Sequence, residues 1–376
     1  MTASMMCMRV LAVTPWFPCA KLPGSGLFNL RDSELIATDH EVTVLHLIAP
    51  SHMDSDEPAV GTAGTKGLRV VRQPFALSNP KLIKQAVAAI RREAAQADLM
   101  HTMAFPALLP GRLARLRKPW VHTEHYSSLV TPPASARMAM ALGTLKRFFK
   151  HPDEVIAVSR ALADVVDQYR STPATVIGNE VMEPTGVVPV RGDLSSSVAM
   201  IGVGGIIDRK GPLPAVDTVA ELQRRGIDAT LTWVGEGDQR AEVLASAERQ
   251  GIADKVRLAG QLEPAELSAE LLTHDLFLLP VETETFGVAL AEALAHGLPI
   301  VATGTGGHEE FLPGEASRLI QRREGAPLAD AVQDILADPA LWSRQQIADY
   351  AAGMFSGAHR LRAYREVYES AVARTR

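Results

Sequence analysis

Two glutamates stand eight positions apart in the stretch ETFGVALAEALAHGLPIVATGTGGHEEF, which covers residues 284–311. Glu284 precedes a Phe-Gly pair, and Glu292 lies in the apolar run that follows. A helix that begins near 286–288 would present unpaired amides and the positive end of its dipole, which favour a phosphate group. Helical side chains lean toward the N-terminus, so Glu292 can reach the same place. Since carboxylates accept hydrogen bonds from sugar hydroxyls, the stretch indicates a pocket for a phosphorylated, hydroxyl-rich ligand.

The alternative is a surface helix that carries two solvated acids. Two features favour the pocket. The Phe-Gly pair stands between the two acids, and Gly287 would let the backbone approach a ligand closely. The segment GTGGHEE follows the next expected strand. Gly297, with Pro299 just beyond it, marks the expected C-terminal end of the helix.

Short apolar runs alternate with helical patterns along the chain. Continuous apolar runs are typical of parallel strands that are covered on both faces. We expect strands at 9–15, 41–50, 68–74, 98–103, 119–125, 154–159, 198–205, 229–237, 256–260, 275–280 and 299–304. We expect helices at 79–96, 137–153, 212–226, 239–251 and 264–274, besides the helix that begins near 286–288. The alternation predicts two tandem α/β units with doubly wound parallel sheets.

The pattern pauses between residues 179 and 197, where Pro, Gly and Ser cluster without periodicity. We therefore expect a first domain at 1–180, a linker at 181–197 and a second domain at 198–356. Ligands of such sheets bind beyond the carboxyl ends of the strands. Two facing domains of this kind would form a cleft for the substrate.

Composition excludes several classes of protein. The chain has 376 residues, of which 47% are hydrophobic and 22% charged, and no apolar run approaches the roughly 20 residues of a membrane-spanning helix. The N-terminal apolar stretch is too short for a signal peptide, and with two cysteines a cytoplasmic setting is expected. Residues 1–185 hold 20 Lys and Arg against 16 Asp and Glu, and the remainder holds 18 against 27. The mildly basic first half suits an acidic or membrane-surface partner as well as chance scatter, and nucleic acid is not indicated.

The second half carries a family resemblance. The stretch from Glu284 to Glu292 resembles the E-x7-E signature of retaining GT-B glycosyltransferases, in particular glycosyltransferase family 4. The segments VGGIIDRKG (203–211), WVGEGDQRAEV (233–243) and VRLAGQLEPAEL (256–267) resemble that family's phosphate loop, VGxG segment and base-contacting turn. Residues 355–371 resemble its terminal helix, which implies that a helix at about 357–376 packs back onto the first domain.

The resemblance implies roles for individual residues. Glu284 would hold the hydroxyls of the transferred sugar, Glu292 those of the ribose, and Lys210 the diphosphate. Leu258 and Gln261 belong to the turn whose backbone would contact the base. Phe286, Gly287 and Val288 would offer backbone amides to the sugar and diphosphate.

Two positions depart from the family pattern. An arginine usually follows the glycine at 204, but this chain has Gly205, so Arg209 or a residue of the first domain must compensate. Thr285 replaces the usual Gly or Ser, and its methyl group would narrow the sugar pocket.

First-domain candidates are less specific. Gly24 and Gly26 follow the first strand, where glycines commonly surround a phosphate, and a plain loop is the alternative. The family often has a histidine that touches the sugar, and His125 matches it best. His101 and His122 lie inside strand patterns and are expected to pack in the core.

The resemblance implies no metal cofactor. The sequence DSD at 54–56 resembles a metal-binding motif of another glycosyltransferase fold, but it lacks the strand–turn context. The helical segment 137–150 is basic and bears Phe148 and Phe149, so it is a candidate for peripheral contact with an anionic membrane, or else a packed helix.

The sequence therefore predicts a retaining glycosyltransferase. It would move a hexose or N-acetylhexosamine from a UDP- or GDP-sugar to a hydroxyl of a small-molecule, lipid or glycan acceptor. A nucleotide-sugar 2-epimerase on the same fold and a non-catalytic sugar-nucleotide-binding protein are the alternatives. The donor base, the sugar and the acceptor stay open.

Overall fold

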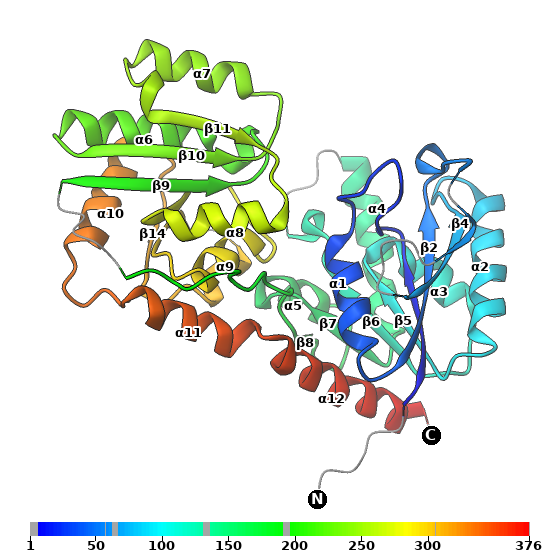
Figure 1. Cartoon of the computed structure of the whole chain (residues 1–376). Helices are drawn as coiled ribbons and strands as arrows, with labels where there is room; N and C mark the ends of the chain where they lie inside the picture. The colour runs from blue at the N-terminus through cyan, green and yellow to red at the C-terminus, as the bar shows by residue number, and fades with distance from the viewer. Residues whose placement is uncertain are drawn as a thin grey trace, which may run out of the picture. The chain divides into compact units, whose positions relative to one another are not determined.

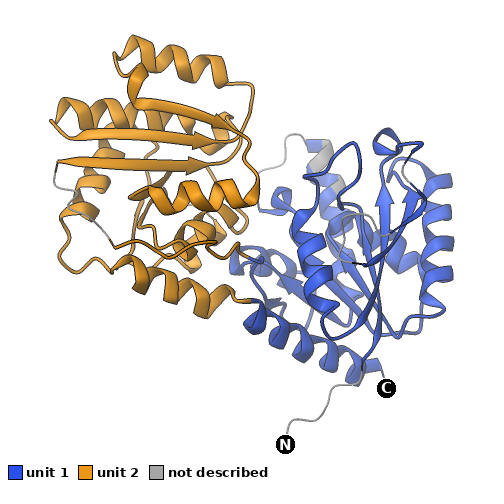
Figure 2. Cartoon of the chain, in the orientation of Figure 1, with its two compact units in different colours: residues 1–180, 357–376 blue, residues 181–356 orange. Residues whose placement is uncertain are grey.

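The computed structural model describes residues 7–56, 58–61, 67–130, 136–190, 196–304 and 306–375. The chain divides into two compact units (Figure 2). Unit 1 contains Met1–Glu180 together with Gly357–Arg376, and unit 2 contains Val181–Ser356. Each unit has its own largely parallel sheet with helices on both faces (Figure 1), so the prediction of two doubly wound α/β domains is confirmed.

The sheet of unit 1 has the strand order β3-β4-β2-β1-β5-β6-β7-β8. Its strands are β1 (Arg9–Thr14), β2 (Glu41–Ile48), β3 (Val60–Gly61), β4 (Arg69–Pro74), β5 (Leu99–Met103), β6 (Trp120–Glu124), β7 (Glu154–Ala157) and β8 (Thr175–Val176). Only the two-residue strand β3 runs antiparallel to its neighbour, among the strands that the structure describes. Every residue of β5 and β6 is buried, as expected for interior parallel strands, although these two strands also carry polar residues.

The helices of unit 1 cover both faces of this sheet. They are α1 (Leu27–Ile36), α2 (Pro80–Ala94), α3 (Leu108–Ala114), α4 (Ala136–Lys146), α5 (Arg160–Asp167) and α12 (Gly357–Thr375). The predicted cap of α2 is confirmed, because Asn79 Oδ1 accepts hydrogen bonds from the amides of Lys81 and Leu82. The helix predicted at 137–153 ends earlier: α4 gives way to a 3₁₀ turn at Arg147–Lys150 before β7 begins.

Helix α12 completes the core of unit 1. Its side chains Tyr364, Val367, Tyr368 and Ala371 belong to one hydrophobic cluster with residues of the strands. Tyr364 and Tyr368 are among the largest fully buried side chains described. The face of the sheet that α12 covers therefore depends on residues from the end of the sequence.

Unit 2 has the strand order β11-β10-β9-β12-β13-β14, with all described pairs of strands parallel. Its strands are β9 (Ser197–Val203), β10 (Asp228–Val234), β11 (Val256–Gly260), β12 (Leu276–Leu279), β13 (Ile300–Thr303) and β14 (Ser317–Ile320). Its helices are α6 (Pro212–Arg224), α7 (Arg240–Arg249), α8 (Pro264–Thr273), α9 (Val288–Ala295), α10 (Gly325–Ala337) and α11 (Arg344–Phe355).

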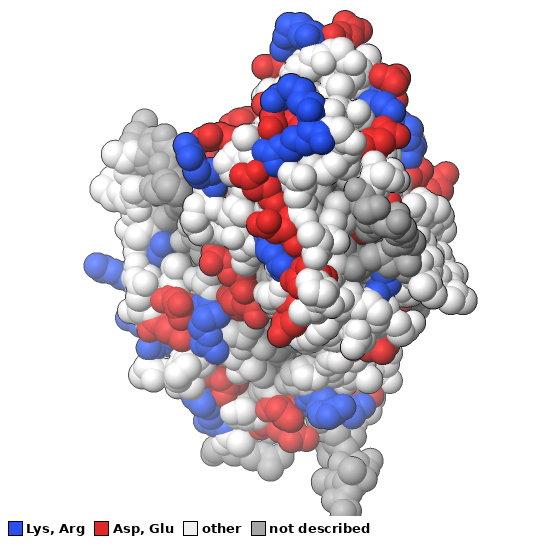
Figure 3. Space-filling view, turned by 90° about the vertical axis from the view of Figure 1, so that its left-hand side faces the viewer, with Lys and Arg blue, Asp and Glu red and all other residues white. Residues whose placement is uncertain are grey.

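In the face of the molecule shown in Figure 3, basic and acidic side chains are interspersed. Within the described ranges, no helix has both the length and the hydropathy that crossing a bilayer requires.

Two buried histidines should make the stability of unit 1 depend on pH. Burial lowers the pKa of His46 in β2 and of His101 in β5 to about 3. The unfolded chain binds their protons near pH 6.5, so between pH 6.5 and 3 it holds more protons than the folded chain. We therefore expect the free energy of unfolding to fall below pH 6.5 by about 1.4 kcal/mol per pH unit for each histidine.

Urea unfolding at pH 7.5, 6.5 and 5.5 measures this loss above the range where carboxylates protonate. His101→Gln should reduce the change of the free energy of unfolding per pH unit. The same substitution at the exposed His359 should leave that change as it is. A stability that is constant across this range would contradict the expectation.

Candidate functional site

The first turn of α9 is open for a ligand because of the glycine before it. Gly287 is the N-cap residue, with φ 90°, and no side chain caps the helix. A Cβ atom at this position would lie 3.0 Å from both His308 Cβ and Leu290 Cδ1. Glycine is therefore needed for both conformation and space, and the first amides of α9 are left for a partner other than a capping side chain.

Glu284 is fixed beside this helix start. Its carbonyl accepts a hydrogen bond from Gly307 N at 2.9 Å, and its backbone pairs with Gly306 as an isolated parallel bridge. Its carboxylate forms an ion pair with Lys210 Nζ, and both side chains are largely buried, at 14% and 17% exposure. The two residues are 74 positions apart, so the fold brings together an acid and a cation that the sequence placed in separate motifs.

Arg209 lies at the same place. Its Nη1 atom donates to the carbonyl of Thr283 at 2.9 Å and lies 4.0 Å from Glu284 Oε2. A Cβ atom at Gly205 would come no closer than 3.6 Å to its neighbours, so the backbone there has room for a larger residue. Crowding therefore does not explain why position 205 lacks an arginine. Compensation by Arg209 stays a prediction.

The side chains that follow Glu284 point into unit 2. The Phe286 ring packs against Phe311 and Phe355, with ring centroids 5.0 Å and 5.8 Å away. Thr285 and Glu292 are 9% and 7% exposed. With its ring held in the core, Phe286 has only its backbone to offer a ligand. The roles expected for Phe286 and Val288 stay predictions.

The turn expected to contact a base lies at the end of β11. The Leu258 carbonyl accepts a hydrogen bond from Arg240 Nη2 at 3.3 Å, and Arg240 Nη1 lies 3.5 Å from Glu236 Oε1. Gln261 is exposed just beyond β11. The sequence did not predict Arg240, the first residue of α7, as part of the site. Its guanidinium lies beside the Leu258 backbone, which is predicted to contact the base.

The two glycines of unit 1 differ in their surroundings. Gly26 caps α1 with φ 66°, and a Cβ atom there would lie 2.2 Å from the Trp16 carbonyl oxygen. A Cβ atom at Gly24 would meet nothing within 4 Å. Close backbone approach explains Gly26, while a phosphate role for either glycine stays a prediction.

His125 lies directly after β6 and is 9% exposed. Its ring packs at a tilt of 36° against that of Phe28 in α1, with centroids 4.4 Å apart, and its Nε2 atom is 3.8 Å from Asp32 Oδ2. Neither ring nitrogen has a hydrogen-bond partner in the described part of the chain. Burial lowers the pKa of His125, an effect that the Asp32 and Glu124 carboxylates oppose, so its ring is neutral at neutral pH.

The other histidines of this region have structural partners. His101 bonds to Tyr368 Oη at 2.8 Å and Thr123 Oγ1 at 2.6 Å. His122 bonds to Thr102 Oγ1 at 2.9 Å and to Glu124 Oε2 at 3.2 Å. Both rings are fully buried, as predicted for packing residues.

Glu124 fixes the turn that carries His125. Its Oε1 atom accepts hydrogen bonds from the amides of His125 and Tyr126, at 2.9 Å and 2.8 Å. The carboxylate is fully buried and therefore positions the histidine backbone.

Comparison with known proteins assigns the family. A family model described as Glycosyltransferase Family 4 matches residues 33–181, and one described as Glycosyl transferases group 1 matches residues 198–338. The fold is similar to that of the Anabaena protein Alr3699/HepE solved in complex with UDP, with a TM-score of 0.76 at 18% identity over 96% of this chain and 100% of the other. The chain is a GT-B glycosyltransferase.

Relatives of this glycosyltransferase differ in what they act on. A glycogen synthase of Mycobacterium tuberculosis is 26% identical over 90% of this chain and 88% of its own length. A GDP-mannose-dependent alpha-(1-6)-phosphatidylinositol monomannoside mannosyltransferase of Mycolicibacterium smegmatis is 28% identical over 88% of this chain and 90% of its own. Such names support the activity class and leave the substrates of this glycosyltransferase open.

Two further residues of the glycosyltransferase were missed at the sequence level. Asp32 lies beneath His125 and pairs with Arg360 of α12. The buried face of α1 is polar, with Asn29, Asp32 and Ser33 buried beside Ile36. The signal available in the sequence was the three- and four-residue spacing of these polar residues, which a search for apolar periodicity passes over.

Proposed function

We propose that this glycosyltransferase is a retaining enzyme that moves a hexose or N-acetylhexosamine from a UDP- or GDP-sugar to an acceptor hydroxyl. The acceptor would be a small molecule, a lipid or a glycan. The Lys210–Glu284 ion pair beside the uncapped start of α9 carries the proposal. A diphosphate-linked sugar requires a cation and backbone amides for its phosphates, and a carboxylate that accepts hydrogen bonds from its sugar hydroxyls. Lys210, the start of α9 and Glu284 supply these groups at one place.

The residues have separate tasks in this reaction. Lys210, with Arg209, would stabilise the charge that develops on the departing diphosphate, together with the amides at the start of α9. Glu284 would hold sugar hydroxyls and Glu292 the ribose hydroxyls. His125, neutral because it is buried, would contact the sugar through one of its ring nitrogens.

The transfer step needs no nucleophile from the protein. The bond between the anomeric carbon and the phosphate oxygen breaks, and the acceptor oxygen bonds to the same face of that carbon. The acceptor proton passes to an oxygen of the leaving diphosphate. Positioning and charge stabilisation are then the contributions of the protein.

Retention gives a direct test. With a donor of known anomeric configuration, proton NMR of the first product formed should show the same configuration in the new glycoside. An inverted product would contradict the proposed mechanism. Release of UDP or GDP that requires an acceptor supports a transferase, whereas release without an acceptor supports the epimerase.

Thermal-shift measurements with UDP, GDP and ADP sugars would select the donor. We expect one base to raise the melting temperature more than the others. Arg240→Ala should change that preference, because its guanidinium bonds to the Leu258 carbonyl. Exposed Arg249, at the other end of α7, provides the control variant. An unchanged order of bases in Arg240→Ala would remove Arg240 from base recognition.

The remaining expectations are independent of this site. Asp54 Oδ1 of the DSD segment accepts a hydrogen bond from Asp56 N at 3.0 Å, which gives the motif a structural use in its loop. Metal independence, a cytoplasmic setting and membrane contact through α4 stay predictions.

A further inference from the structure

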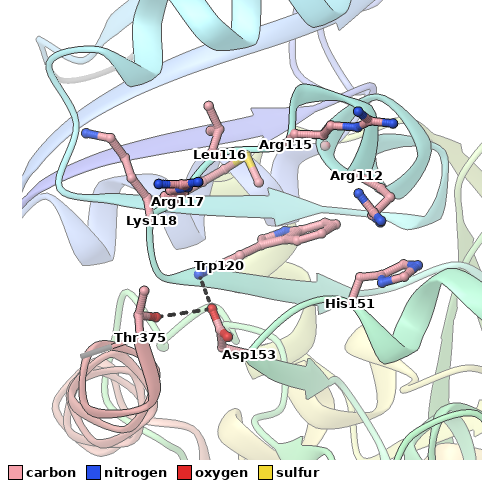
Figure 4. A pocket seen from close by; sticks show the side chains of 11 residues that line it. Arg112, Arg115, Leu116, Arg117, Lys118, Trp120, His151, Asp153 and Thr375 are labelled. Atoms are coloured by element: carbon pink, nitrogen blue, oxygen red, sulfur yellow. Dashed lines mark hydrogen bonds between the residues drawn. The ribbon is translucent and has the colours of Figure 1, made fainter.

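A cavity of about 270 Å³ lies in unit 1 at the amino-terminal edge of its sheet (Figure 4). Trp120, the first residue of β6, and Asp153, immediately before β7, form part of its wall, and α3 with the loop that follows forms another part. His125 follows the opposite end of β6. A five-residue strand extends about 13 Å, so the cavity is separate from the part of unit 1 assigned to sugar transfer.

The chain around this cavity is depleted of acids. Residues 99–152 contain eight Lys and Arg and a single acid, Glu124, which is fully buried at the far end of β6. Four of these cations line the cavity, namely Arg112, Arg115, Arg117 and Lys118. A wall of this composition raises the local concentration of anions.

Asp153 is the single acid among the residues that line the cavity, and its Oδ2 atom is engaged by two neutral donors, while one of the four cations, Lys118, is bonded to the backbone. Asp153 accepts a hydrogen bond from Trp120 N at 2.8 Å and one from Thr375 Oγ1 at 3.5 Å (Figure 4). Lys118 Nζ donates to the Ala97 carbonyl. Within the described part of the chain, the guanidinium groups of Arg112, Arg115 and Arg117 form no hydrogen bond or ion pair.

The neighbouring arginines show the contrast. Arg91 donates to the carbonyls of Ala114 and Leu113 at the end of α3, and Arg170 donates to four backbone carbonyls. These two stabilise the fold. The three arginines of the cavity have planar donors left for a ligand, and such donors match phosphate oxygens in pairs.

His151 also lines the cavity. Its pKa is lowered first by burial and then by repulsion from Arg112 and Lys150, so two cations act on this ring in addition to its burial.

We propose that this cavity binds a ligand that carries at least two negative charges on phosphate groups, at a site separate from the donor site. The ligand is a soluble phosphorylated metabolite or the phosphorylated headgroup of a lipid, since both present the same chemistry. The inference goes beyond the proposed sugar transfer and does not depend on it.

Isothermal titration with glycerol 3-phosphate tests the soluble source; pyrophosphate is unsuitable because it would also bind at the diphosphate-binding donor site. The double variant Arg115→Gln/Arg117→Gln should fold normally, because both side chains are exposed. It should bind about tenfold more weakly or worse, since each lost contact joins two charged groups. The exposed pair Arg249→Gln/Arg362→Gln removes the same charge elsewhere and should bind as the wild type does.

Sedimentation with phosphatidylcholine vesicles, with or without phosphatidylinositol 4-phosphate, tests the lipid source. Binding to the phosphorylated lipid alone, lost in Arg115→Gln/Arg117→Gln, would identify a headgroup. The probe that the wild type binds should bind equally well to Lys210→Ala, because Lys210 belongs to the donor site. Equal weakening in both double variants, loss of binding in Lys210→Ala, or binding of no probe would overturn the proposal.

Discussion

Replacing Lys210 by alanine is expected to lower kcat of sugar transfer by about 100- to 1,000-fold, the usual effect of removing one preorganised donor from a developing negative charge. Lys210 is 17% exposed and pairs with Glu284 beside the start of α9. Without Lys210, the Glu284 carboxylate keeps Arg209 as a neighbouring cation in the described part of the chain. Arg209 Nη1 lies 4.0 Å from Glu284 Oε2. Because Arg209 is 40% exposed, it is a weaker substitute.

The comparison needs a matched lysine. Lys255 also pairs with an acid of unit 2, Asp228 at 2.8 Å, and it is located before β11, at the opposite edge of the sheet. Lys255→Ala should keep kcat within twofold or so, as surface pairs contribute little. Glu292→Ala should lose most turnover as Lys210→Ala does. Near wild-type transfer by either site variant would refute the assignment of the site.

Replacing Asp32 by alanine is expected to lower the free energy of unfolding by about 3–5 kcal/mol. Asp32 forms an ion pair with Arg360, and both side chains are 2% exposed. Its second carboxylate oxygen accepts a hydrogen bond from Tyr364 Oη at 2.9 Å. The variant leaves a buried guanidinium without its counter-charge and a buried hydroxyl without its acceptor, so urea unfolding should report a large loss.

The chain offers an exposed counterpart of this pair. Asp39 accepts a hydrogen bond from Arg365 Nε at 2.5 Å, again between the region of α1 and helix α12, but Arg365 is 44% exposed. Asp39→Ala should cost at most about 1 kcal/mol. The double variant Asp32→Ala/Arg360→Met should recover part of the loss, since no unpaired charge remains buried. If Asp32→Ala costs no more than Asp39→Ala, the buried pair does not hold α12.

The sequence identified most of the architecture because interior strands such as β1 and β12 carry apolar residues on both faces. The predicted strands at 41–50 and 299–304 occur as β2 and β13, shortened at their ends. Helix α1 was not predicted, because its buried face is polar and follows a glycine-rich loop. Helix α3 was missed for another reason: with seven residues it is too short to show a helical period.

The sequence predicted those residues of the candidate site that stand out within one local motif. Glu284, Lys210 and Gly287 each stood out by residue type and setting. The contacts of Arg240 with Leu258 and of Asp32 with His125 join different elements, so no local pattern announces them. The ion pair of Lys210 with Glu284 likewise depends on how β9 and β12 pair in the sheet, which only the folded chain shows.

The return of α12 to unit 1 determines when each unit can fold on the ribosome. Residues 181–356 separate Glu180 from Gly357, so all of unit 2 is translated before the residues that cover the first sheet emerge. Until then, Asp32 lacks Arg360, and His101 lacks the Tyr368 hydroxyl. The nascent first unit therefore waits with an uncovered apolar face, and the second unit is complete before it. The order in which the two units are translated therefore differs from the order in which their cores have all their residues.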